Sequence, residues 1–172
     1  MPALRSVPAP TPALASLALA LGLAGCGSAP PGAGGVATLD GQPPLMIAHR
    51  GASGYLPEET LEAYARAIEL GADVIEMDLV STQDGVLITR HDPNLALSTD
   101  VASKPEFAAR KRTMQVDGET QTGWFSQDFT LAEIKRLGAI STDAERPQQY
   151  NGRYKVPTFQ EVLDLVKATE QR

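Results

Sequence analysis

The chain contains only two histidines, and each follows a short apolar segment that is typical of a buried strand. Leu45–Ala48 leads to His49, and Val86–Thr89 leads to His91. Barrel enzymes place catalytic groups at strand ends. General acid–base catalysis near neutral pH needs one group that takes a proton from the attacking atom and another that gives a proton to the leaving atom, and imidazole suits both tasks. The two histidines are therefore predicted to act as general acid and base, with their individual roles left open.

Two carboxylates stand two residues apart in a segment expected to form a strand, Asp73–Val80. The pleat of a strand would send the side chains of Glu76 and Asp78 to the same face. A cation between them removes the cost of burying two like charges, and an all-oxygen pair favours Ca²⁺, with Mg²⁺ as the alternative, over zinc. A solvated strand face is the other interpretation, but it would place polar residues where the sequence has Val74 and Val80.

Arg50, beside the first histidine, carries a planar guanidinium suited to bidentate contact with phosphate oxygens. Its alternative role is a salt bridge to Glu58 or Asp92, and one side chain could serve both purposes.

The segments between these residues indicate an α/β fold. A helix is expected where apolar residues recur at helical spacing after Thr60, its N-cap, and before Gly71, its stop. The residues of its apolar face are Leu61, Tyr64, Ala65 and Ile68. A turn at Gln83-Asp84-Gly85 precedes the third strand. The order strand, helix, strand and further strand predicts the beginning of a parallel (β/α)₈ TIM barrel.

Residues 94–128 are too long and too polar for an ordinary loop, so we expect an irregular insertion after the third strand, at the catalytic end of the barrel. Two helices with capping boxes follow, one at Thr130 and Glu133 and one at Thr158 and Glu161.

The N-terminus predicts export from a bacterial cell. Residues 1–25 have the length of a signal peptide, and their apolar run, Ala13–Ala24, is too short to span a bilayer as a helix. Leu23-Ala24-Gly25-Cys26 resembles a lipobox, so we expect a periplasmic or membrane-anchored lipoprotein attached to the membrane only through lipidated Cys26, the sole cysteine. An ordinary signal peptide with an incidental cysteine is the alternative. Residues 26–44, rich in Gly, Pro, Ala and Ser, are expected to be a flexible tether, leaving residues 45–172 as the folded domain.

The formal net charge of −6 argues against nucleic acid as a partner, because binding to phosphate backbones requires a basic surface. A small phosphodiester remains compatible with this charge, since a bound divalent cation reverses the sign of the local potential.

Several ordered motifs together resemble the glycerophosphodiester phosphodiesterase family, in particular its periplasmic bacterial branch. They are the run from His49 to Glu58, Gly71-Ala72-Asp73, Glu76-Met77-Asp78, Thr82-Gln83-Asp84-Gly85, His91-Asp92, the run from Asp128 to Lys135 and the run from Val156 to Val162. The resemblance implies a TIM-barrel hydrolase that converts glycerophosphodiesters, such as glycerophosphocholine, to glycerol 3-phosphate and an alcohol. It also implies that His49 and His91 are the acid and base, that Arg50 contacts phosphate, that Glu76 and Asp78 bind the metal, and that Glu58 lies at the same centre as a weaker candidate ligand.

Two departures from the family pattern stand out. Glu59 occupies a position where many members have asparagine. The third metal carboxylate of the family follows the helix that ends near Lys167, so we expect this chain to hold only the N-terminal half of the barrel and to be inactive alone. A complete barrel needs about 250 residues.

Two rival functions remain. A phospholipase of the same superfamily would act on intact lipid, and its insertion would be expected to expose aromatic clusters; here Phe107, Trp124 and Phe125 are sparse among charges. A non-catalytic surface lipoprotein would not need to retain both histidines and both carboxylates.

Overall fold

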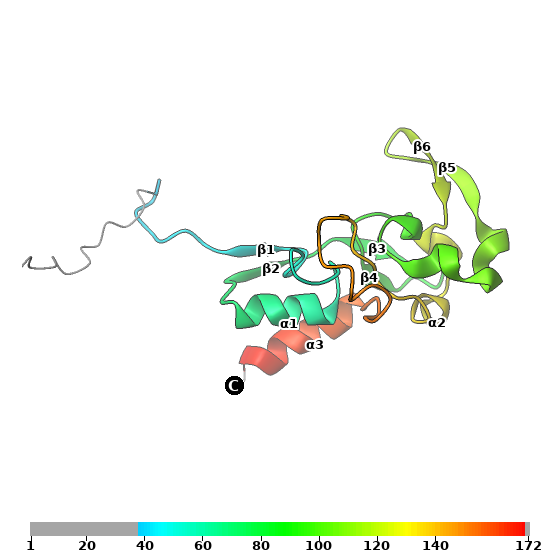
Figure 1. Cartoon of the computed structure of the whole chain (residues 1–172). Helices are drawn as coiled ribbons and strands as arrows, with labels where there is room; N and C mark the ends of the chain where they lie inside the picture. The colour runs from blue at the N-terminus through cyan, green and yellow to red at the C-terminus, as the bar shows by residue number, and fades with distance from the viewer. Residues whose placement is uncertain (1–37, 171–172) are drawn as a thin grey trace, which may run out of the picture. The chain divides into compact units, whose positions relative to one another are not determined.

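The computed structural model describes residues 38–170, and from Gln42 onward these residues form one compact unit (Figure 1). The predicted signal peptide, Cys26 and most of the predicted tether lie outside the described residues. The described end of the tether, residues 38–44, contains turns and bends.

The first three elements form a parallel β–α–β unit. Strand β1 (Ile47–His49) pairs in parallel with β2 (Val74–Glu76), so that His49 lies opposite Glu76, and α1 (Leu61–Glu69) connects them. The Thr60 hydroxyl accepts the Ala63 N–H and caps α1, as predicted. Gly71 has a φ of +87°, a conformation that glycine adopts without strain, and ends the helix where the sequence indicated. This unit is the repeating element of a parallel barrel.

The apolar face of α1 differs from the prediction. The residues with buried side chains are Ala63, Tyr64 and Ala67, whereas Leu61, Ala65 and Ile68 are half-buried. The reason is that α1 has two neighbours: the Ala52 N–H donates to the Ala63 carbonyl on one side, and α3 (Phe159–Glu170) lies along the other. Figure 1 shows α1 and α3 packed beside each other.

The single strand expected over Asp73–Val80 is wrong. After β2 the chain leaves the strand at Met77 and Asp78 and begins a new one, β3 (Leu79–Ser81), which pairs antiparallel with β4 (Leu87–Thr89). The break occurs because the backbone of Asp78 bonds elsewhere: its N–H donates to a carboxylate oxygen of Glu59, and its carbonyl accepts the Arg90 N–H. The predicted turn at Gln83–Gly85 closes the β3–β4 hairpin, with Gly85 at a φ of +79°.

The predicted insertion contains regular elements. It contains the 3₁₀ helices η1 (Leu95–Leu97), η2 (Asp100–Ser103), η3 (Pro105–Arg110) and η4 (Ser126–Asp128), and the antiparallel hairpin of β5 (Arg112–Val116) and β6 (Glu119–Gly123). Asp117 and Gly118 have positive φ angles at the hairpin tip, where such values match the strand twist.

The main hydrophobic core joins the insertion to the rest of the domain. Its members are Ile88, Leu95, Val101, Phe107, Trp124, Phe129, Ile134, Leu137 and Val156. Insertion residues therefore supply part of the core, and their burial accounts for the order of a segment whose polar composition suggested a loop.

Both predicted capping boxes are present. In α2 (Leu131–Ile134) the Thr130 N–H donates to Glu133 Oε2 at 3.0 Å, and before α3 the Thr158 N–H donates to Glu161 Oε2 at 2.6 Å. Each helix thus begins at the residue that its local sequence specified.

Candidate active site

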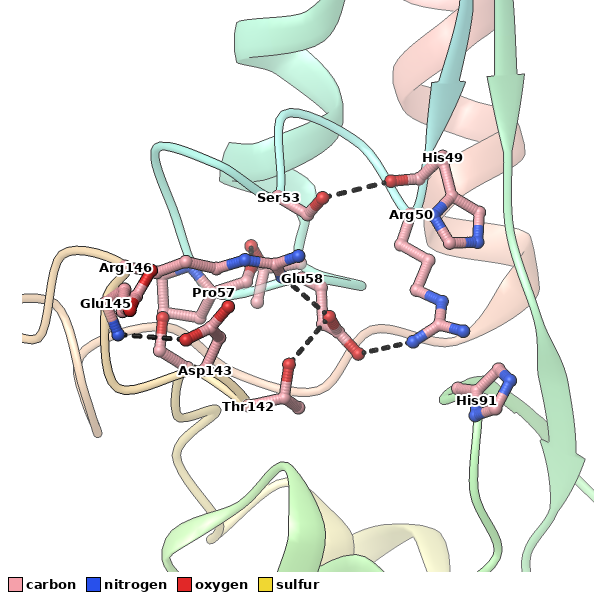
Figure 2. Close-up of polar contacts among 12 residues, drawn as sticks. His49, Arg50, Ser53, Pro57, Glu58, His91, Thr142, Asp143, Glu145 and Arg146 are labelled. Carbon is pink, nitrogen blue, oxygen red and sulfur yellow. Dashed lines mark hydrogen bonds and ion pairs between the residues drawn. The ribbon is translucent and has the colours of Figure 1, made fainter.

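The two histidines lie at strand ends, as predicted. His49 is the last residue of β1, and His91 follows the end of β4 by two residues. His91 Nδ1 lies 3.0 Å from Asp92 Oδ2, and 46% of the His91 side chain is exposed. Figure 2 shows the Arg50 guanidinium between the two imidazoles in that view. Both histidines are exposed to solvent.

Arg50 is the centre of the polar contacts. Its N–H donates to Glu76 Oε2 at 2.9 Å, its Nη1 donates to Glu58 Oε1 at 3.0 Å, and its Nε lies 3.2 Å from Asp78 Oδ2. Of the two salt bridges considered as the alternative role of Arg50, the one to Glu58 is present, whereas Asp92 pairs with His91. Arg50 also has a φ of +60°, an uncommon value for a residue with a side chain that surrounding contacts must hold in place.

Glu76 and Asp78 converge, but not for the reason that the sequence suggested. The strand ends between them, so strand parity does not apply; both carboxylates instead contact Arg50. Asp78 Oδ2 is buried and, within residues 38–170, makes no hydrogen bond beyond its ion pair with Arg50. A buried oxygen left in this state suits a cation as its missing partner.

The charges around Arg50 are closely matched. Four carboxyl groups, those of Glu58, Glu59, Glu76 and Asp78, lie near three guanidinium groups, those of Arg50, Arg90 and Arg146. A divalent cation at Asp78 would add positive charge for an incoming phosphate. Residues 38–170 contain no ready-made group of three or more His, Cys, Asp or Glu side chains arranged around a common metal position.

Glu58 makes contacts that compete with its predicted role as a metal ligand. Its side chain is only 4% exposed. Oε1 accepts from Arg50, while Oε2 accepts from Thr142 Oγ1 at 3.0 Å and from Arg146 Nη1 at 3.1 Å (Figure 2). Sequence reasoning missed Thr142 and Arg146, because contacts between residues more than 80 positions apart leave no periodic signal.

A buried polar layer lies next to the site. Glu59, Tyr64 and Arg90 have no exposed side-chain area. The Tyr64 hydroxyl and the Asp78 N–H both donate to the Glu59 carboxyl group, and burial raises the pKa of Glu59 and that of Tyr64. Burial also lowers the pKa of Arg90 to about 10, which leaves its guanidinium protonated at neutral pH. This layer fixes the position of the Asp78 backbone.

The three aromatic residues of the insertion are buried: Phe107, Trp124 and Phe125 are at most 7% exposed. They therefore do not form the exposed aromatic cluster expected of a lipid-facing enzyme. None of the helices within residues 38–170 has the length and apolar character needed to cross a membrane.

The parallel β–α–β unit with polar groups at its strand ends is part of a (β/α)₈ barrel of the kind that carries hydrolytic sites. Residues 49–171 match the glycerophosphoryl diester phosphodiesterase family, and the chain belongs to that family.

Two curated relatives illustrate the similarity. Over 122 residues the chain is 55% identical to glycerophosphodiester phosphodiesterase GDPD6 of Arabidopsis thaliana, covering 71% of the chain and 33% of the relative. Over 138 residues it is 37% identical to a glycerophosphodiester phosphodiesterase of Haemophilus influenzae, covering 74% of the chain and 35% of the relative. The chain thus spans about a third of the length of these relatives.

Solved structures of phosphodiesterases are similar to this chain as well. The glycerophosphodiester phosphodiesterase of Agrobacterium tumefaciens matches with a TM-score of 0.52 and 27% identity, over 72% of this chain and 43% of that one. A phosphodiesterase of Oleispira antarctica, solved in complex with the product sn-glycerol-3-phosphate, matches with a TM-score of 0.51 and 26% identity, over 73% of this chain and 40% of that one.

Proposed function

We propose that this chain carries the catalytic groups of a glycerophosphodiester phosphodiesterase, which hydrolyses glycerophosphodiesters such as glycerophosphocholine to glycerol 3-phosphate and an alcohol. One observation carries the proposal: the contacts of Arg50 join Glu58, Glu76 and Asp78, next to His49 at the end of β1 and with His91 two residues past the end of β4. The product in the Oleispira structure supports the substrate class.

The histidines would move the protons. Asp92 as a carboxylate only accepts hydrogen bonds, so its contact at 3.0 Å holds the proton of neutral His91 on Nδ1 and leaves Nε2 free to take one. This favours His91 as the base that deprotonates the attacking oxygen and His49 as the acid that protonates the leaving oxygen. The attacking oxygen would belong to a neighbouring substrate hydroxyl or to water.

Arg50 would bind the phosphate. Its Nε and Nη1 face Asp78 and Glu58, which fixes the plane of the guanidinium and presents its remaining edge to an anion. A substrate phosphate held there would lie beside both imidazoles. Proton transfer would then take place within the bound complex, without collision with a separate acid or base.

Glu76 and Asp78 would hold a divalent cation, with Ca²⁺ favoured over Mg²⁺. The buried Asp78 Oδ2, which makes no hydrogen bond among the described residues beyond its ion pair with Arg50, supports this part of the proposal. When bound, such a cation supplies Lewis-acid polarisation of a phosphoryl oxygen. The contacts of Glu58 favour a role in holding Arg50, so Glu58 is the weaker candidate ligand.

The proposed location is the periplasm or the outer face of a bacterial membrane, reached through the predicted signal peptide and held by lipidated Cys26. The sequence around Cys26 supports this, and it lies outside the described residues.

The test of the catalytic proposal is hydrolysis of glycerophosphocholine by the full-length protein, followed through release of glycerol 3-phosphate with Ca²⁺ added. Intact phosphatidylcholine serves as the second substrate. Release of glycerol 3-phosphate supports the proposal, whereas turnover of the intact lipid alone would favour the phospholipase. A protein inactive on both would point to the non-catalytic lipoprotein.

A further inference from the structure

The carboxylate of Glu58 is shared between two arginines that are far apart in sequence. Arg50 donates to Oε1 at 3.0 Å and Arg146 to Oε2 at 3.1 Å, with Thr142 also on Oε2. Because the Glu58 side chain is 4% exposed, water cannot easily replace a lost partner. The orientation of Glu58, and so of the Arg50 Nη1 group that it holds, depends on both cations.

Arg146 belongs to a surface loop, residues 141–151, which backbone contacts hold firmly at its base. The Ala139 N–H donates to the Tyr154 carbonyl at 2.8 Å and the Gly152 N–H to the Ala139 carbonyl at 2.8 Å. Gly138 lies so close to Gly152 that a Cβ on Gly138 would stand 2.5 Å from the Gly152 Cα. The loop therefore leaves the domain at a fixed position.

Bonds within the loop then fix the place of Arg146. Its N–H donates to the Asp143 carbonyl at 3.2 Å, and Gln148 Nε2 donates to the carbonyls of Asp143 and Arg146 at 2.8 Å. The Ser141 N–H donates to Asn151 Oδ1 at 2.8 Å across the loop. Figure 2 shows the result, with Arg146 approaching Glu58 from the side opposite to Arg50.

We propose that Arg146 is a positioning residue that holds the phosphate-binding Arg50 in place through their shared carboxylate, Glu58. This rests on the proposed function, in which Arg50 contacts the substrate phosphate. Without Arg146, Glu58 Oε2 keeps only the hydrogen bond from Thr142, and the carboxylate is drawn toward Arg50, which would rotate the guanidinium away from its phosphate-facing orientation. Because Arg50 contacts phosphate in the ground state and the transition state alike, the loss falls mainly on KM.

The experiment compares Arg146→Gln, Arg146→Lys and Arg153→Gln in the full-length protein, with glycerophosphocholine as substrate. Arg153 is an exposed arginine just after the same loop, with its guanidinium 6.0 Å from the Tyr150 ring, so its variant removes the same charge without touching Glu58. We expect Arg146→Gln to raise KM by about 10-fold or more with a smaller change in kcat. This is the size of effect expected when the Arg50 guanidinium is slightly displaced. Arg146→Lys should recover part of the loss, and Arg153→Gln should behave like the parent.

A double variant separates positioning from general destabilisation. If Arg146 acts through Arg50, then Arg146→Gln added to Arg50→Gln should cost little more, whereas independent roles would give additive losses. A thermal midpoint for each variant shows whether unfolding explains the change. An unchanged KM in Arg146→Gln, or fully additive losses, would overturn the inference.

A calorimetric titration with sn-glycerol 3-phosphate keeps the two proposals distinguishable. If the parent protein fails to hydrolyse any glycerophosphodiester but binds this ligand, the proposed function fails and weaker binding by Arg146→Gln still supports the inference. Equal binding by parent and variant, or no binding by either, overturns it.

Discussion

Arg50 Nε lies 3.2 Å from Asp78 Oδ2, so the guanidinium expected to bind phosphate contacts a carboxylate expected to bind metal. The two roles are compatible because the remaining edge of the guanidinium stays free for an anion. A cation held by Asp78 and the Arg50 guanidinium would then contact the same phosphate, so cation binding and phosphate binding should strengthen each other.

The first prediction concerns this cation. Exhaustive chelation should abolish turnover and Ca²⁺ or Mg²⁺ should restore it, because the buried Asp78 Oδ2 has only its ion pair with Arg50 and no hydrogen bond among the residues described. Asp78→Asn should lose stoichiometric metal binding by equilibrium dialysis, while Asp164→Asn, an exposed aspartate on α3, should retain it. Activity that survives chelation with no metal bound would remove the cation from the mechanism.

The second prediction concerns the histidines. His49→Ala or His91→Ala in the full-length protein should lower turnover by about 10² to 10⁴, the range for loss of a general acid or base. Both rings lie at exposed strand ends, so the thermal midpoint should change little. Near-normal turnover in either variant would exclude that residue from proton transfer.

The third prediction is a pH dependence of stability. Hydrogen bonds from Arg110, at 2.8 and 2.5 Å, are the main reason why the pKa of Glu133 falls from its ordinary 4.5 to about 2. The unfolded chain binds this proton at higher pH than the folded chain, so the stabilisation is complete above about pH 5 and is lost as the pH falls toward 2.

The corresponding variant is Glu133→Gln, which should cost about 1 kcal/mol of unfolding free energy at neutral pH through the weakened cap and ion pair. It should also flatten the decline of stability between pH 5 and 2 in denaturant titrations. Glu119→Gln, at an exposed position on β6, is the control. If the unfolding free energy of Glu133→Gln and that of the parent fell equally steeply between pH 5 and 2, the proposed link between Glu133 protonation and stability would be contradicted.

The fourth prediction concerns the N-terminus. If Leu23-Ala24-Gly25-Cys26 is a lipobox, the mature protein begins with a lipidated Cys26. Mass spectrometry of the N-terminal peptide checks this. Cleavage at another residue, or an unmodified thiol, would leave only an ordinary signal peptide, and Cys26→Ser should then leave membrane association unchanged.

The fifth prediction concerns the 172-residue chain expressed by itself. Leu45, Met46 and Ile47 are 68%, 55% and 60% exposed, and β1 pairs with only one strand among the residues described. An apolar strand edge of this kind associates with other chains. The chain alone should therefore self-associate and lack turnover.

Light scattering would measure that association. Ile47→Lys should reduce it by placing a charge on the edge, whereas Leu97→Lys, at a similarly exposed position in η1, should not. A monomer with cooperative unfolding and substantial turnover would show that these residues suffice without further strands.

Features with local causes could be predicted from the sequence. Thr60 caps α1 through atoms three residues away, and the two capping boxes each span four residues, so short segments already specify where these helices begin. The strand-end positions of both histidines follow from equally local changes of polarity. Their catalytic roles stay predictions.

Features that depend on residues far apart in the chain could not be predicted from the sequence. The strand containing Glu76 ends before Asp78 because the Asp78 amide bonds to Glu59, 19 residues earlier. Arg146 reaches Glu58 across 88 residues, and the insertion is ordered by burial against residues outside it. Such contacts depend on the completed tertiary structure.

The contact between Gly138 and Gly152 has a genetic consequence. Every amino acid except glycine carries a Cβ, so any missense change in the Gly138 codon places a carbon where the backbone of Gly152 already stands. The base of the loop would have to open, and Arg146 would move with it. A random screen for inactive alleles should therefore recover Gly138 beside the histidine codons, although glycine contributes no chemistry of its own.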